Sequence, residues 1–118
     1  MIIKLKKTKA IPFQLEGVKG EFICDIPKAG DFVSFWAKFR GCEGTEEEKA
    51  QKQTELVVET FSKFITEVKF EKEVTFQNET GEAIDPVKAL KEFFNFFFYQ
   101  KGMEFLNPSF GSDADPLE

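Results

Sequence analysis

Phenylalanine is the feature that most constrains this chain, because 16 of its 118 residues are Phe, beside one Trp and one Tyr. Each buried aromatic ring removes roughly 150 to 250 Å² of surface from water, so a core built from rings is strongly driven to close. A chain of this length buries only about two thirds of the surface that its unfolded form exposes. We therefore expect some rings to remain outside the core, in a groove or in a contact with another chain.

The remaining composition favours one soluble globular domain and argues against several kinds of enzyme. Hydrophobic residues make up 42% and charged residues 31%, which is a globular balance. The chain has no histidine, so a Ser-His-Asp hydrolase, a His-ligated zinc site and a Cys-His protease are disfavoured, and we expect no enzymatic activity, metal or cofactor. Cys24 and Cys42 belong to no CxxC set, and without a secretory signal we expect reduced thiols in a cytosol. No apolar run reaches the roughly 18 to 20 residues of a membrane span, so we expect no membrane association.

The charge of the chain disfavours nucleic acid as a partner, since the formal net charge is −5. Lysines nevertheless gather at the N-terminus, where they indicate either an anion-binding arm or the solvated face of an edge strand (Lys4, Lys6, Lys7 and Lys9). Trp36 and its neighbouring rings could stack on bases, but only Lys38 and Arg40 lie near enough to follow phosphates. Core packing is the alternative for these rings.

Residues 1–27 have the pattern of a β element. Ile3 and Leu5 alternate with lysines, which is typical of a half-buried strand. Two further alternating runs predict a hairpin over residues 10–27, with a glycine-bracketed loop at residues 17–20 and Pro27 after it. The apolar positions of these runs are Ile11, Phe13 and Leu15, then Phe22, Cys24 and Ile26.

Residues 31–101 have the pattern of about three helices. Asp31 precedes an aromatic stripe at helical spacing that stops at Gly41. Thr45 and Glu48 form a capping-box pattern ahead of a long helix. Its apolar face comprises Val57, Phe61, Phe64, Ile65 and Val68, after which Val74 and Phe76 indicate a short strand and residues 78–81 a turn.

The last predicted helix begins at Asp85-Pro86, covers residues 86–101 and ends at Gly102. Its second half reads FFNFFFY over residues 93–99, more rings than one helix face can hold. Either this helix is surrounded on all sides by the same chain, or part of it contacts a partner or a second copy. We predict an α+β fold in a single domain over residues 1–108, with a small N-terminal antiparallel hairpin or sheet, followed by a flexible acidic tail over residues 109–118. The predicted protein-binding residues are Phe32, Trp36, Phe93, Phe96 and Phe98.

Two acidic motifs have alternative interpretations. Glu67-Val68-Lys69 could serve a metal-dependent nuclease together with Asp25, but an i, i+2 pair on a helix does not face one side. The run of glutamates at residues 46–48 could bind a divalent cation, but it lacks the ligand order and glycine turn of a calcium loop. Placing negative charge on the first turn of the long helix explains it better.

The stretch from Ile65 to Phe94, ITEVKFEKEVTFQNETGEAIDPVKALKEFF, resembles the small tail assembly chaperones of long-tailed bacteriophages. In that family a helix often leads into a strand, a polar turn with Gly-Glu, a proline-bearing helix start and an aliphatic helix. The resemblance implies a non-enzymatic protein in the host bacterial cytoplasm that coats the tape-measure protein and helps tail-tube subunits to polymerise around it. The resemblance implies as partners the tape-measure or tail-tube protein and a second copy of the chain. A tail-completion or head–tail joining protein that forms a ring is the alternative, and a metal-dependent nuclease is a third.

Overall fold

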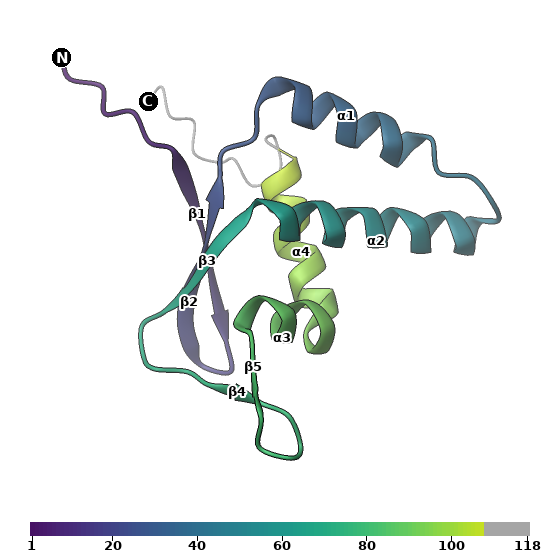
Figure 1. Cartoon of the computed structure of the whole chain (residues 1–118). Helices are drawn as coiled ribbons and strands as arrows, with labels where there is room; N and C mark the ends of the chain where they lie inside the picture. Colours follow the sequence, from purple (N-terminus) through teal and green to yellow (C-terminus); the bar gives the residue numbers. More distant parts are fainter. Residues whose placement is uncertain (108–118) are drawn as a thin grey trace.

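The computed structural model describes residues 1–107, which form an α+β fold with a three-stranded antiparallel sheet followed by helices (Figure 1). This confirms the predicted class, with four helices in the described residues instead of about three. The predicted tail, 109–118, lies outside them. In chain order the elements are β1 (Thr8–Leu15), β2 (Val18–Asp25), α1 (Ala29–Arg40), α2 (Glu46–Phe64), β3 (Ile65–Phe70), β4 (Phe76–Gln77), β5 (Ala83–Ile84), α3 (Pro86–Phe93) and α4 (Asn95–Leu106).

The hairpin of β1 and β2 forms as predicted, with a tighter turn. Glu16 and Gly17 both have positive φ, 50° and 78°, as a two-residue hairpin turn with the twist of the strands requires. The predicted loop at residues 17–20 is therefore wrong, and Gly20 lies within β2 opposite Phe13. A Cβ at Gly20 would lie 2.8 Å from the Phe13 ring and 2.6 Å from the Lys69 carbonyl, so only glycine lets the ring pack there.

The strand predicted at Ile3 and Leu5 is wrong. Residues 1–7, which we call the N-terminal arm, extend away from the sheet, and these two side chains are 73% and 91% exposed. Strand β1 begins at Thr8 because its partner β2 ends at the paired Asp25. Ile26, predicted on the apolar face, lies past that end and is also exposed.

The long helix also ends earlier than its apolar pattern predicts. Helix α2 begins with the predicted capping box, in which the Glu48 N–H donates to Thr45 Oγ1 at 3.1 Å and the Thr45 N–H donates to Glu48 Oε1 at 2.9 Å. It stops at Phe64, and β3 follows without a connecting loop and pairs with β2. Ile65 and Val68 fit helical spacing, but the open edge of β2 decides their conformation. The sheet order is therefore β1-β2-β3.

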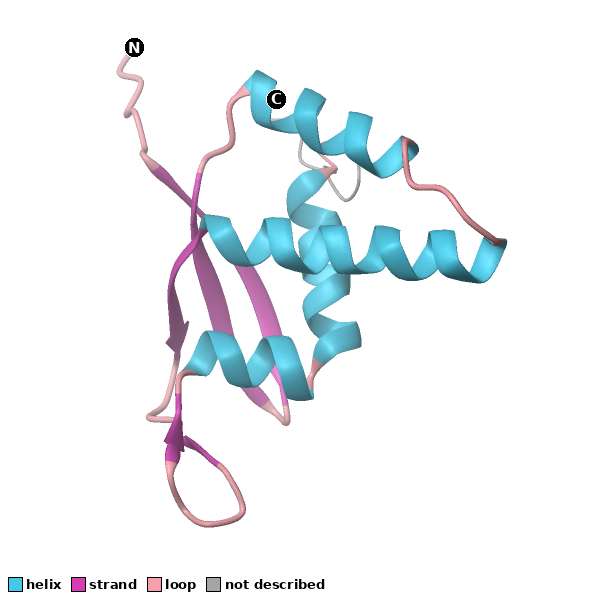
Figure 2. Cartoon of the chain, turned by 45° about the vertical axis from the view of Figure 1, so that its right-hand side comes forward, coloured by secondary structure: helices cyan, strands magenta, loops and turns pink. Residues whose placement is uncertain are grey.

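The predicted last helix is in fact two helices, because the chain breaks at Phe94 (φ −123°, ψ 47°). Its start is as predicted, with the Lys88 N–H donating to Asp85 Oδ2 at 3.2 Å. Gly102 does not end the helix: it is buried within α4, which continues to Leu106. Helix α4 crosses α2 steeply at this point (Figure 2).

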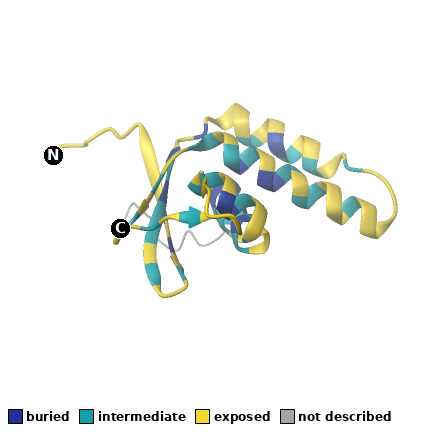
Figure 3. Ribbon diagram, turned by 60° about the horizontal axis from the view of Figure 1, so that its bottom comes forward, coloured by how far each residue is buried: buried dark blue, intermediate teal, exposed yellow. Residues whose placement is uncertain are grey.

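The core lies between the inner face of the sheet and helices α2 and α4. Three fully buried rings define its centre, with centroids 5.2 Å apart for Phe22 and Phe61, 5.7 Å for Phe22 and Phe98, and 5.0 Å for Phe61 and Phe98. Helix α1 and the outer half of α2 project from this body and carry most of their residues exposed (Figure 3). The radius of gyration, 16.0 Å, accordingly exceeds the roughly 13 to 14 Å of a compact chain of this length.

Candidate functional site

The core takes up most of the phenylalanines. Of the fifteen in the described residues, six are buried, six more are partly buried and pack against the core, and only Phe93 and Phe96 are exposed, at 67% and 70%. The surplus of rings expected outside the core is therefore small, and it is concentrated at one place. That place is the break between α3 and α4.

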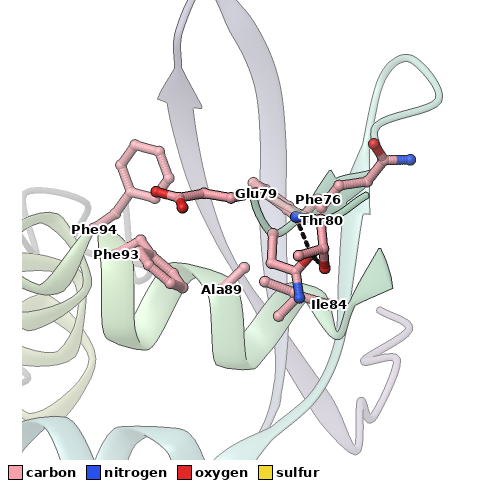
Figure 4. A pocket seen from close by; sticks show the side chains of 9 residues that line it. Phe76, Glu79, Thr80, Ile84, Ala89, Phe93 and Phe94 are labelled. Carbon is pink, nitrogen blue, oxygen red and sulfur yellow. Dashed lines mark hydrogen bonds between the residues drawn. The ribbon is translucent and has the colours of Figure 1, made fainter. Parts of the chain in front are cut away.

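The break at Phe94 lies between the two exposed rings, and the first of them, Phe93, lines an apolar groove. Phe93 ends α3, and Phe96 lies in the first turn of α4, where its ring stacks on Tyr99 at a centroid distance of 6.4 Å. The groove has a volume of about 530 Å³ and is bounded by α3 on one side and by the β4–β5 hairpin on the other (Figure 4). We call the two rings and the groove together the aromatic corner. The groove is lined by Phe76, Gln77, Asn78, Glu79, Thr80, Ile84, Ala89, Phe93 and Phe94.

The polar side of the groove is the turn of the β4–β5 hairpin, which was predicted at residues 78–81. Asn78 Oδ1 accepts hydrogen bonds from the Thr80 N–H at 3.0 Å, the Thr80 hydroxyl at 2.7 Å and the Glu82 N–H at 2.9 Å. Gly81 has φ 87°, which glycine adopts without strain. With the turn fixed in this way, the Glu79 side chain extends across the mouth of the groove towards Phe94 (Figure 4).

The apolar side of the groove is held by the rest of the fold. The Lys91 ammonium on α3 lies 2.7 Å from the Glu59 carboxylate on α2, and the ring of Phe76 lies 6.0 Å from that of Phe70. Phe70 in turn meets Phe13 of the core edge-on at 5.7 Å. The groove is thus an open continuation of the aromatic core.

The five predicted binding residues fall in three different environments. Phe93 and Phe96 lie together at the aromatic corner. Phe98 is fully buried among the core rings, so the expectation that it contacts a partner is wrong for the folded chain. Its position follows from the break, which turns the next helix so that this ring faces the sheet.

The other two predicted residues, Phe32 and Trp36, lie on α1 and are half-buried. The Trp36 indole N–H donates to the Leu106 carbonyl at 3.0 Å, and its ring packs edge-on against Phe35 at 4.8 Å. Trp36 therefore fastens α1 to the C-terminal end of α4. The aromatic corner lies at the other end of α4, roughly 15 Å away for a helix of this length, so the structure does not unite the two predicted pairs.

Part of the groove could be predicted from the sequence. A strand at Phe76 and a turn after it were predicted, but the returning strand β5 was not, since Ala83–Ile84 is too short to show alternation. Ala89 was not singled out because it lies outside the aromatic pattern. It is the small side chain at this position that leaves the space between α3 and the hairpin.

Within the described residues, the acidic motifs do not form a buried cluster or a metal-binding group. Glu67 and Lys69 lie on β3, where an i, i+2 pair does share a face, so the objection from helical spacing does not apply. Both are exposed, as is Asp25. Within residues 1–107 no group of three or more Cys, Asp or Glu side chains could hold a metal ion.

Two further findings concern thiol chemistry and membranes. Cys24 is buried in the core, and its burial raises the pKa of the thiol to about 12, so it is protonated at neutral pH. None of the described helices is both long enough and apolar enough to cross a lipid bilayer.

Comparisons of the chain with protein-family models, with curated proteins and with solved structures found no match.

Proposed function

We propose that this chain is a non-enzymatic protein-binding factor of phage tail morphogenesis, which works in the host bacterial cytoplasm. In this role it chaperones the tape-measure protein while the tail tube assembles. The observation that carries the proposal is the aromatic corner, where the exposed Phe93 lines an apolar groove and the exposed Phe96 follows three residues later. A holdase needs such a surface, and the net charge of −5 keeps the chain soluble while the surface is uncovered.

The order of elements around the corner supports the same proposal. Helix α2 leads into strand β3, a polar turn with Gly81-Glu82 follows, and the Asp85-Pro86 helix start completes the order described above for the tail assembly chaperones. This stretch contains the groove and ends at the break. The proposed binding surface therefore lies in the part of the chain that carries the resemblance.

The proposal is tested by co-expressing the full chain with the product of a neighbouring tape-measure reading frame and measuring how much of that product stays soluble. We expect the wild-type chain to keep it in solution and Phe93→Ser/Phe96→Ser to lose that effect. Val33→Ser is the matched control, because Val33 is 68% exposed on α1, away from the corner. Equal solubility with all three chains would contradict the proposal.

Light scattering separates this function from the alternative of a ring-forming tail-completion or head–tail joining protein. A chaperone should change its oligomeric state with concentration, because its binding surface has to become free for a client. A permanent ring at micromolar concentration would favour the structural component.

A further inference from the structure

The N-terminal arm and the aromatic corner both expose apolar side chains, and the charges that accompany these side chains are of opposite sign. The arm reads MIIKLKK, and its apolar side chains are almost entirely exposed: Met1 110%, Ile2 87%, Ile3 73% and Leu5 91%. It carries three lysines and no acidic residue. The groove offers an apolar wall and a carboxylate, Glu79, at its mouth.

We infer that the arm of one copy binds in the groove of a second copy. An extended segment alternates its side chains between two sides, so Met1, Ile3 and Leu5 can face the apolar wall together. Lys4 and Lys6 then lie at the mouth of the groove, beside Glu79. Charge complementarity of this kind selects the partner and its orientation.

The charges around the groove are consistent with a basic occupant. Glu79 and Glu82 lie on the hairpin turn, and Glu79 lines the groove. Of the two lysines on α3, Lys91 is already paired with Glu59 and Lys88 lies in the first turn. Among the described residues that line the groove, the charged one is Glu79, so the groove carries a negative charge whereas the arm is basic.

The groove of the same chain is out of reach of its own arm. The arm leaves the sheet at Thr8, and the β4–β5 hairpin lies at the opposite end of the molecule (Figure 1). Strand β1 alone spans about 26 Å at 3.3 Å per residue, whereas a fully extended arm of seven residues spans about 23 Å. An arm made of residues 1–7 and folded back along β1 would end before the hairpin, so an arm that binds in the groove belongs to another copy.

The contact joins two different surfaces, so it is heterologous unless two copies exchange arms reciprocally. The inference rests on the expectation, stated with the resemblance, that a second copy of the chain is a partner, and it is independent of any tape-measure client. The test below contains only this chain. Its failure would leave the client-binding proposal standing, and failure of the client experiment would leave this inference standing.

Sedimentation velocity of the full chain from about 1 to 500 µM, with two single variants, tests the inference. Ile3→Glu changes the arm and Phe93→Glu changes the groove, and both positions are exposed, so folding should be unaffected; circular dichroism checks this. We expect wild type to associate and each variant to weaken association at least about tenfold. Val33→Glu, at an exposure matched to Phe93, should associate like wild type.

A mixture of the two variants is the decisive sample. The Ile3→Glu chain keeps an intact groove and the Phe93→Glu chain keeps an intact arm, so together they should form a one-to-one dimer that neither forms alone. A wild-type chain that stays monomeric over the whole range would overturn the inference. So would association that survives either variant, or a mixture that fails to dimerise, because arm and groove would then not bind each other.

Discussion

Replacing Gly102 with alanine tests how closely helices α4 and α2 approach. In an open helix interior this change stabilises a protein by roughly 0.5 to 1 kcal/mol, since glycine loses more backbone freedom on folding than alanine. At Gly102, however, a Cβ would lie 3.0 Å from Val57 Cγ1, 3.1 Å from Phe61 Cβ and 3.3 Å from Phe61 Cγ. Carbon atoms pack best at about 3.5 to 4.0 Å, so the two helices would have to separate.

The expected magnitude follows from these opposing effects. Overfilling a packed core costs typically about 1 to 3 kcal/mol. After subtraction of the propensity gain, Gly102→Ala should lower the free energy of unfolding by about 1 kcal/mol, and Gly102→Val should lower it by more. Gly30→Ala in α1 is the matched control: nothing lies within 4 Å of its Cβ position, so it should gain up to about 1 kcal/mol.

Urea unfolding, followed by circular dichroism, gives the comparison. The two alanine variants should differ by about 2 kcal/mol, which separates their midpoints by about 1 M if the slope is about 2 kcal/mol per M. Gly102→Ala as stable as Gly30→Ala would refute the reasoning, because α4 would then not press on α2 at this residue.

Three further predictions follow from burial and from the shifted pKa values. Phe98→Ala should lower the free energy of unfolding by about 3 to 5 kcal/mol in urea, whereas the exposed Phe96→Ala should change it by less than about 0.5 kcal/mol; similar losses would contradict the core described here. At pH 8 a thiol reagent should modify Cys42 quickly, and it should modify the buried Cys24, whose pKa is about 12, only after denaturation. Equal rates of modification would instead show that Cys24 is accessible in the folded chain. Hydrogen bonds from the backbone and side chain of the N-cap threonine of α2 lower the pKa of Glu48, so the stabilisation that its carboxylate provides is present above the unfolded pKa of about 4.5 and is lost as the pH falls through the folded pKa. The melting temperatures of Glu48→Gln and wild type should therefore converge in acid. A difference in melting temperature that stays constant from pH 6 to pH 3 would contradict this.

The sequence predicted best the elements whose signals are local. The hairpin alternation, the Thr45 capping box and the Asp85-Pro86 start all depend on neighbouring residues, and all three form. The ends of helices that depend on distant partners were predicted wrongly. Ile65 leaves helical geometry because it pairs with β2. Gly102 is a glycine because α4 passes close to α2 at this residue, and it does not mark the end of the helix.

The candidate site was predicted in part for the same reason. Exposure of Phe93 and Phe96 could be proposed from the excess of rings, but only the break at Phe94 decides which rings turn inward. A run that is apolar on all sides contains no periodicity to locate such a break. The groove also depends on the returning strand β5, which is too short to predict.

The junction of α2 and β3 has a mechanical consequence. Phe64 ends the helix and Ile65, at φ −75° and ψ 123°, already begins the strand, so no slack chain separates the two elements. A rotation of α2 about its axis must therefore displace β3 along β2, and the hydrogen bonds between these two strands oppose that displacement. Amides in the last turn of the helix and in the strand should accordingly show one common free energy of opening in hydrogen exchange, because the two elements open as a unit.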